Sequence, residues 1–447
     1  MKRKIVLCII ITLMSFHAAF ADGTKLSEVT ISSQIPLSTN EQNEVAYSVN
    51  PISPWEYQSK LGKGMNVDWS KTQKGKENYN LKVVQDFEAA GVNHVRIRIK
   101  DKADNDLFVA LDEQIDDCIN TGIIPIIAYQ ADAFKNNPNE ENLQKVVDWW
   151  RTVAERYKDK SYLLSFDLLI EATDALNKQP EKLNELYERI VTEVRKTNPQ
   201  RIIFISPRLR SDAQYLSELK IPSQANGYLM AEWHFYASGP SKENERKLWT
   251  TGTEKEKNLI RNKIQLALEW QKKTGIPTWV GAWMAGNYND GDDYSVKEQV
   301  IFAHFMVSEL KKAGIPFAVN ADTHFYDREN KTWIKKMLPL RYCIFSSYGQ
   351  AVKALFTDSA NKISKITKRS SSSAVVEWTK LTWAKKYKVE ISTSKAFKNK
   401  KVYTVTGNKK TLSNLKKGTS YYVRVKGCYV SNGKNVYSKY SSIKVIK

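Results

Sequence analysis

Carboxylates and an imidazole follow short apolar runs in the middle of this chain at regular spacing. In FDLLIEATD, Asp167 and Glu171 are four residues apart, and in AEWHFY, Glu232, His234 and Tyr236 alternate. Side chains two residues apart on a strand lie on the same face of the sheet. The pattern therefore predicts strand ends that present several ionisable groups together, which is what general acid–base chemistry needs.

Other apolar runs end in polar or aromatic residues at equivalent places. Arg96 lies within GVNHVRIRI, Gln130 follows AY, and Asp322 lies in NADTHFYDR. Trp69 and Trp283 also follow apolar runs, and an indole can cover the apolar face of a sugar ring. We therefore predict that Gln130, Trp69, Trp283 and Asp322 contact a substrate.

The residues that carry this chemistry must be positioned by strands, because the apolar runs alternate with segments of helical period. The expected strands are 61–67, 94–99, 123–129, 163–171, 201–206, 227–236, 278–282 and 317–320, and the expected helices include 81–90, 110–121, 141–157, 180–197, 254–274 and 295–313. Eight strand–helix units over residues 51–358 predict a (β/α)8 TIM barrel, with functional groups at the carboxyl ends of its strands. An open doubly wound sheet is the alternative, but no glycine-rich phosphate fingerprint follows the first strand.

The pattern changes after residue 359, where period-two runs separated by turns continue to the end of the chain. They predict a small all-β sandwich over residues 360–447, with Trp378 and Tyr421 in its core. This segment resembles a fibronectin type III domain. It holds 22 Lys or Arg against two acids, Glu377 and Glu390, and so carries +20 of the formal net charge of +21. We expect it to hold an anionic cell-wall polymer.

The amino-terminal segment predicts export. Residues 1–21 combine a basic start, an apolar run and the small-residue sequence AFA, which is the pattern of a secretory signal peptide. Residues 22–50 read as a polar linker. No other apolar run is long enough to span a membrane, so we expect a secreted monomer, extracellular or associated with the cell wall. Nucleic acid is not expected as a partner of an exported protein.

The motifs LGKGMN, GVNHVRI, FDLLIEA, EWHFY and PTWVGAW, in this order, resemble those of glycoside hydrolase family 5, which includes many cellulases and mannanases. The resemblance implies a TIM barrel, a β-linked polysaccharide or oligosaccharide in its mouth, and no metal or cofactor. It also implies that Glu171 is the catalytic acid/base and that Arg96, His234 and Tyr236 match family positions around it. The family's nucleophile, a Glu after the glycine of the seventh strand, corresponds here to Ala282.

Two hypotheses follow from the alanine at this degenerate nucleophile position. Alanine cannot form a covalent glycosyl ester, and Ile170 stands where the family has an Asn that holds the sugar. The chain is either a glycosidase that uses Glu171 with another carboxylate, Glu232 or Asp322, or with water, or a non-catalytic glycan-binding pseudoenzyme. In either case Arg96 needs an anion, and Asp167, Glu232 and Asp322 are the candidates, because a buried unpaired guanidinium is costly.

Overall fold

The computed structural model describes residues 50–235, 249–284, 294–431 and 433–447. The expected signal peptide, nearly all of the expected linker and Tyr236 lie outside the described residues. Among the helices of the described part, none combines the length and the apolar character that crossing a membrane requires.

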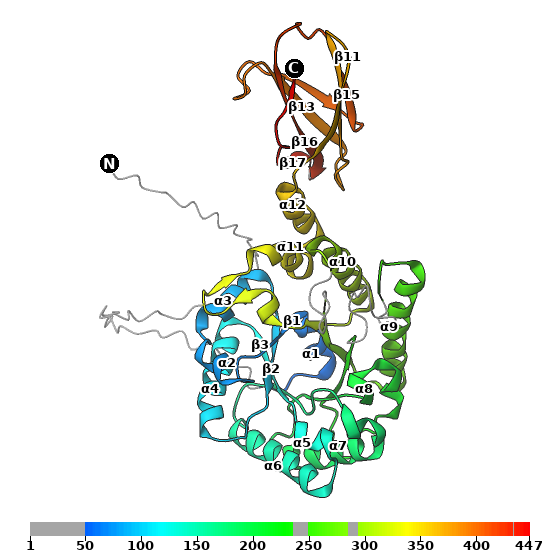
Figure 1. Cartoon of the computed structure of the whole chain (residues 1–447). Coiled ribbons are helices and arrows are strands. Elements are labelled where there is room, and N and C mark those ends of the chain that lie inside the picture. Colours follow the sequence, from blue (N-terminus) through cyan, green and yellow to red (C-terminus); the bar gives the residue numbers. More distant parts are fainter. Residues whose placement is uncertain (1–49, 236–248, 285–293, 432) are drawn as a thin grey trace, which may run out of the picture. The chain divides into compact units, whose positions relative to one another are not determined.

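Eight parallel strands close into the barrel that the sequence predicts, each strand pairing with the next and β8 pairing with β1 (Figure 1). The strands are β1 (Lys63–Val67), β2 (His94–Ile99), β3 (Ile124–Tyr129), β4 (Ser165–Asp167), β5 (Ile203–Ile205), β6 (Leu229–His234), β7 (Thr278–Trp283) and β8 (Phe317–Val319). Strand β2 has the predicted bounds. Strand β4 is shorter than predicted, because the chain leaves the sheet after Asp167 instead of continuing to Glu171.

Amphipathic helices surround the barrel and bury their apolar faces against it. The long ones are α3 (Leu81–Ala90), α4 (Asn105–Thr121), α6 (Glu140–Arg156), α7 (Pro180–Arg195), α9 (Glu254–Thr274) and α10 (Val296–Ala313). The remaining helical segments are α1 (Pro54–Leu61), α2 (Gln73–Glu77), α5 (Asp132–Asn136), α8 (Arg208–Ser211), α11 (Leu338–Arg341) and α12 (Tyr348–Asp358). Helices α9 and α10 begin with a capping box and end at Gly275 and Gly314 in left-handed conformation, as their sequences indicate.

Helix α1 is an element that the periodicity did not predict. It precedes β1, and its Tyr57 and Leu61 pack with Phe204 and Trp279 in a buried cluster of their own, separate from the main core. The Tyr57 hydroxyl donates to the Leu163 carbonyl oxygen at 2.6 Å. The helix therefore shares its core with the barrel strands β5 and β7.

Residues after Ala360 form two antiparallel sheets, in agreement with the predicted sandwich. The strands are β11 (Ile363–Ser370), β12 (Ser373–Trp378), β13 (Lys386–Ser392), β14 (Lys401–Val405), β15 (Lys409–Leu412), β16 (Tyr421–Ser431), β17 (Lys434–Tyr437) and β18 (Lys444–Ile446). One sheet has the order β11–β12–β15, and the other has the order β14–β13–β16–β17, with β18 also on β16. Trp378 is buried in the core between them, and the Lys416 backbone N–H donates to the Tyr421 hydroxyl at 3.0 Å, a tyrosine corner.

Candidate active site

Arg96 on β2 lies between two buried carboxylates inside the barrel. Its Nε donates to Asp167 Oδ2 at 2.7 Å, and its Nη2 lies 2.5 Å from the same oxygen and 2.7 Å from Glu232 Oε1. All three side chains are buried. Of the three anions proposed for Arg96, the structure thus selects Asp167 and Glu232, because Asp322 is paired elsewhere.

His234 connects this buried group to Glu171. Its Nδ1 lies 2.9 Å from Glu171 Oε1, and its Nε2 lies 2.8 Å from Glu232 Oε1. Burial disfavours the imidazolium, but the two carboxylates outweigh burial and raise the pKa of His234 from 6.5 to about 9. Burial likewise opposes the ionisation of Glu171, yet hydrogen bonding to His234 lowers the Glu171 pKa below its usual value. At neutral pH the resting site therefore holds His234 as an imidazolium, hydrogen-bonded to Glu171.

The loops after β4 and β5 hold Glu171 in place through strained backbone. Glu171 has a φ of 56°, and Leu209, Arg210 and Ser211 have φ values of 53°, 56° and 60°. Non-glycine residues rarely adopt this left-handed conformation, and such strain is concentrated at functional sites. The Arg210 backbone N–H donates to the Ala172 carbonyl oxygen at 3.0 Å, and Arg210 Nη1 lies 3.6 Å from Glu171 Oε2. The sequence analysis did not single out Arg210.

A bulge in β7 orients the position of Ala282. Trp233 pairs with Val280 but His234 pairs with Ala282, so β7 advances two residues where β6 advances one. The side chains of Val280 and Trp283 both pack in the main core, outside the barrel. The two residues between them therefore lie on the inner side of the barrel. Gly281 is required here, because a Cβ at that position would lie 1.8 Å from Glu232 Oε1. Ala282 is buried and belongs to neither the main core nor the α1 cluster.

Both tryptophans that were expected to stack on sugar are buried against protein. The Trp283 ring packs edge-on to Phe302 and Phe317, because the bulge turns this side chain outward. Trp69 packs against Tyr79, and its Nε1 donates to Asp322 Oδ2 at 3.2 Å. Neither indole exposes a face that a ligand could contact. The burial of both rings contradicts the prediction that they stack on sugar.

Asp322 and Gln130 occupy different surroundings at the mouth. Asp322 is buried beside Arg328, whose Nε lies 3.4 Å from its Oδ2, and burial raises the Asp322 pKa to about 6. Gln130 accepts a 3.1 Å hydrogen bond from Lys135 Nζ, which also donates to the Ile170 carbonyl oxygen at 3.1 Å. Lys135 is a missed residue. Its buried ammonium contacts the backbone of Ile170, the residue that precedes Glu171. A lysine at the fourth position of a short helix carried no sequence signal for this role.

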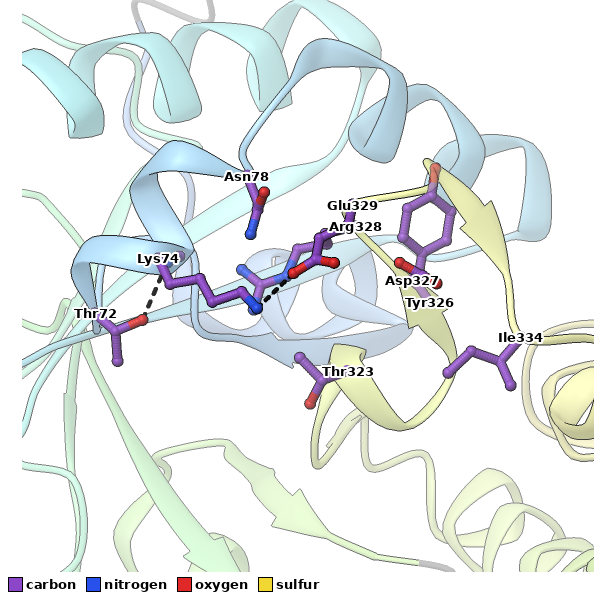
Figure 2. Close-up of a pocket in the computed structure, with 10 residues that line it drawn as sticks. Thr72, Lys74, Asn78, Thr323, Tyr326, Asp327, Arg328, Glu329 and Ile334 are labelled. Atoms are coloured by element: carbon purple, nitrogen blue, oxygen red, sulfur yellow. Dashed lines mark hydrogen bonds and ion pairs between the residues drawn. The ribbon is translucent and has the colours of Figure 1, made fainter.

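A cavity of about 360 Å³ lies between the loops that follow β1 and β8 (Figure 2). Its walls carry hydroxyl, amide and charged groups: Thr72, Lys74, Asn78, Thr323, Tyr326, Asp327, Arg328 and Glu329. Lys74 and Glu329 form an exposed ion pair across it. The cavity is on the same end of the barrel as Glu171, because both follow the carboxyl ends of parallel strands. Among the described residues, no group of three or more His, Cys, Asp or Glu side chains is arranged to hold a metal ion.

Replacing Arg96 with methionine is expected to destabilise the chain by about 3–5 kcal/mol, because two buried carboxylates then lose their counter-charge. Chemical unfolding of the two proteins measures the difference. Arg151→Met, which removes an exposed arginine paired with Asp148, is the matched control and should cost less than about 1 kcal/mol. Equal losses of unfolding free energy in the two variants would contradict the proposed role of Arg96 as the counter-charge of Asp167 and Glu232.

The raised pKa of His234 also predicts a pH dependence of stability. A histidine whose folded-state pKa exceeds its unfolded value stabilises the fold fully below the unfolded pKa, and this contribution is lost as pH rises through the folded pKa. The free energy of unfolding should therefore fall between pH 6.5 and about 9, by roughly 2–3 kcal/mol. His234→Gln should lose this decline. The same slope in the variant would show that another group causes it.

The chain combines a (β/α)8 TIM barrel with a fibronectin type III-like sandwich. The family model for cellulase, glycosyl hydrolase family 5, matches residues 56–321, and the fibronectin type III model matches residues 362–444. The chain belongs to glycoside hydrolase family 5.

Individual relatives match this chain at low identity. Endoglucanase H of Acetivibrio thermocellus is 24% identical over 318 residues, 65% of this chain and 34% of that protein. A β-xylosidase of Phanerodontia chrysosporium is 20% identical over 190 residues, 39% of this chain and 38% of that protein. The chain therefore spans little more than a third of either relative.

Among solved structures, an endoglucanase of the hyperthermophilic Thermotoga maritima superposes with a TM-score of 0.57 at 22% identity, covering 66% of this chain and 100% of that one. The cellulose synthase subunit Z of Clostridioides difficile gives a TM-score of 0.52 at 21% identity, covering 62% and 98%. At these identities the two structures show a shared fold.

Proposed function

We propose that the barrel hydrolyses O-glycosidic bonds of a β-linked polysaccharide at its mouth, with Glu171 as the acid/base. The observation that supports this proposal is the array Glu171–His234–Glu232, with Arg96 beneath it. A general acid must take up and release a proton at the reacting oxygen. In this array the imidazolium of His234 is the proton reserve, because its Nδ1 is within hydrogen-bond distance of Glu171.

The attacking group in this reaction is water, which bonds to the anomeric carbon and releases a proton to bulk solvent while Glu171 gives its proton to the departing glycosidic oxygen. Ala282 has no oxygen to attack the anomeric carbon, and Glu232 cannot replace it, because Glu232 and Glu171 bind opposite nitrogens of one imidazole. The ring stands between the two carboxylates, so no sugar can bridge them as it bridges the pair in a retaining enzyme. Glu232 is also fully buried. The proposed reaction therefore passes through no glycosyl ester.

The cavity between the β1 and β8 loops supports glycan binding. Its volume of about 360 Å³ lies in the range of small-ligand pockets, and its walls supply several hydrogen-bonding groups that suit sugar hydroxyls. A polysaccharide that reached from Glu171 to this cavity would cross the carboxyl ends of the strands.

A second candidate function, glycan binding without turnover, is favoured by a different observation. The β7 bulge places residue 282 on the inner side of the barrel, yet the residue there is alanine, and Ile170 stands at the family's sugar-holding Asn. Such a site keeps its shape while lacking the group that attacks sugar. The expected signal peptide at 1–21 supports action outside the cell for either candidate.

The test is incubation of the purified chain with cellulose, mixed-linkage β-glucan, mannan and xylan, followed by measurement of new reducing ends. Release from at least one polymer is expected. Calorimetry with the matching oligosaccharides separates the alternatives, because binding without release supports the second candidate. Neither release nor binding would reject both functions.

A further inference from the structure

One outer face of the sandwich carries positively charged side chains in register. In β13 and β16 the valines at 389, 423 and 425 belong to the core, so alternation places Lys388, Arg424 and Lys426 on the opposite face. Lys388 pairs directly with Lys426 across the two strands, and Arg424 is two residues from Lys426. Like charges that face each other across strands are destabilising.

Tyrosine rings alternate with these cations. Lys388 Nζ lies 4.9 Å from the centre of the Tyr437 ring, and Lys426 Nζ lies 4.4 Å from Tyr437 and 4.5 Å from Tyr440. The Arg424 guanidinium lies 3.9 Å from Tyr440. We call these five residues the cation–aromatic ladder. The rings hold the cations in fixed positions, because a cation over an aromatic face is attracted to it.

The acid nearest the ladder is already neutralised. Arg424 Nη2 lies 2.7 Å from Glu390 Oε2, while Lys400 Nζ at 2.8 Å and the Tyr440 hydroxyl at 2.7 Å contact Oε1. Glu377, the other acid after residue 359, is on β12 in the other sheet. Among the residues that the structure describes, neither Lys388 nor Lys426 has a carboxylate within ion-pair distance. Within the described part of the chain, these two ammonium groups therefore have no ion-pair partner.

We propose that the cation–aromatic ladder binds an anionic carbohydrate polymer, with Lys388 and Lys426 contacting its carboxylate or phosphodiester groups. A carbohydrate fits better than a nucleic acid for two reasons. The ladder cations lie against the rings of Tyr437 and Tyr440, on which unpaired bases would otherwise stack. The same chain also carries a barrel of a polysaccharide-acting family. This surface is separate from the barrel site and does not depend on turnover there.

The test measures binding of the full chain to polygalacturonate, to polyglycerol phosphate and to neutral hydroxyethylcellulose, at about 20 mM and about 300 mM NaCl. The first two probes distinguish carboxylate from phosphodiester. At low salt, we expect binding to at least one of these two anionic polymers. We expect the ladder not to bind the neutral polymer. High salt should weaken binding to the anionic polymers about tenfold or more. Absence of binding to both anionic polymers would overturn the proposal.

A matched pair of variants separates the ladder from the overall charge. Lys388→Gln with Lys426→Gln and Lys365→Gln with Lys368→Gln each remove two charges, but the second pair lies on exposed β11 in the other sheet. The ladder pair should raise the dissociation constant about tenfold and the control pair less than about threefold. Lys388→Arg with Lys426→Arg should retain binding, because both positions keep their charge. Equal losses from the two pairs, or tighter binding to single-stranded DNA than to either polymer, would overturn the proposal.

Discussion

Replacing Glu171 with glutamine is expected to reduce the release of reducing ends by about 10²–10⁴, the usual contribution of a general acid. Glutamine keeps the size of the side chain and can still contact His234 Nδ1, but it cannot pass a proton to the leaving oxygen. The initial rate on whichever β-linked polymer the wild type degrades fastest is the measurement. Substrate binding should change much less than the rate.

The control for this experiment is a variant of Glu232, the carboxylate of the same array that is fully buried. Glu232→Gln keeps the contact with His234 and stays next to Gly281, so any rate loss there reports on the proton balance of the imidazole. If Glu171→Gln retained the wild-type rate, Glu171 would not be the acid/base. A loss of the same size in Glu232→Gln, with normal stability, would show that His234 and its proton control the rate.

Introducing glutamate at Ala282 is expected to raise hydrolysis by roughly 10²–10³, because it supplies the nucleophile that the proposed reaction lacks. The β7 bulge already places residue 282 on the inner side of the barrel, paired with His234. A new carboxylate there would also raise the pKa of Glu171, because two nearby negative charges disfavour each other. Because Glu171 must be protonated to act as the acid, the fall of the rate at high pH should then begin at a higher pH than in the wild type.

Ala282→Gln is the matched control, since it has the same size and no nucleophilic carboxylate. It should stay at the wild-type rate. Nuclear magnetic resonance of the first product gives a second readout, because a covalent intermediate at residue 282 predicts retention of the anomeric configuration. A glutamate variant that folds normally and gains no activity would show that further residues, such as Ile170, also prevent the retaining reaction.

The barrel could be predicted from sequence because its signal is repeated eight times. Most of the apolar runs are followed by a segment of helical period, and capping residues such as Ser295 with Glu298 mark where helices begin. The core positions of Trp378 and Tyr421 were predicted for the same reason, since the period-two pattern that places them is local. Helix α1 was missed because its short sequence precedes the first repeat unit.

The site was harder to predict because its geometry depends on departures from strict alternation. Trp279 points into the barrel, so strict alternation along β7 would also point Trp283 inward, at the mouth. The bulge at Gly281 and Ala282 shifts the alternation by one residue, and Trp283 points outward. Glu171 is displaced in a similar way, because the chain leaves β4 at Asp167 and reaches the mouth through a left-handed turn. A one-residue shift of this kind has no compositional signature.

The sequence limited the possible ion-pair partners of Arg96 to three carboxylates but did not identify which of them bind it. The need for an anion followed from the cost of a buried charge, and three carboxylates were in reach along the strands. Which two pair with it depends on strand stagger around the closed barrel, a three-dimensional property. The outcome that both Asp167 and Glu232 contact Arg96 also explains why Glu232, the suggested substitute nucleophile, faces the buried interior.

The bulge in β7 has a genetic consequence. Codons for alanine and glutamate differ by a single second-position base whenever the alanine codon ends in a purine. A backbone that still directs residue 282 inward means that one such base change would place a carboxylate in the mouth without any rearrangement of the strand. Random mutagenesis followed by growth on the cognate polymer would therefore recover that substitution early, ahead of combinations that need several changes.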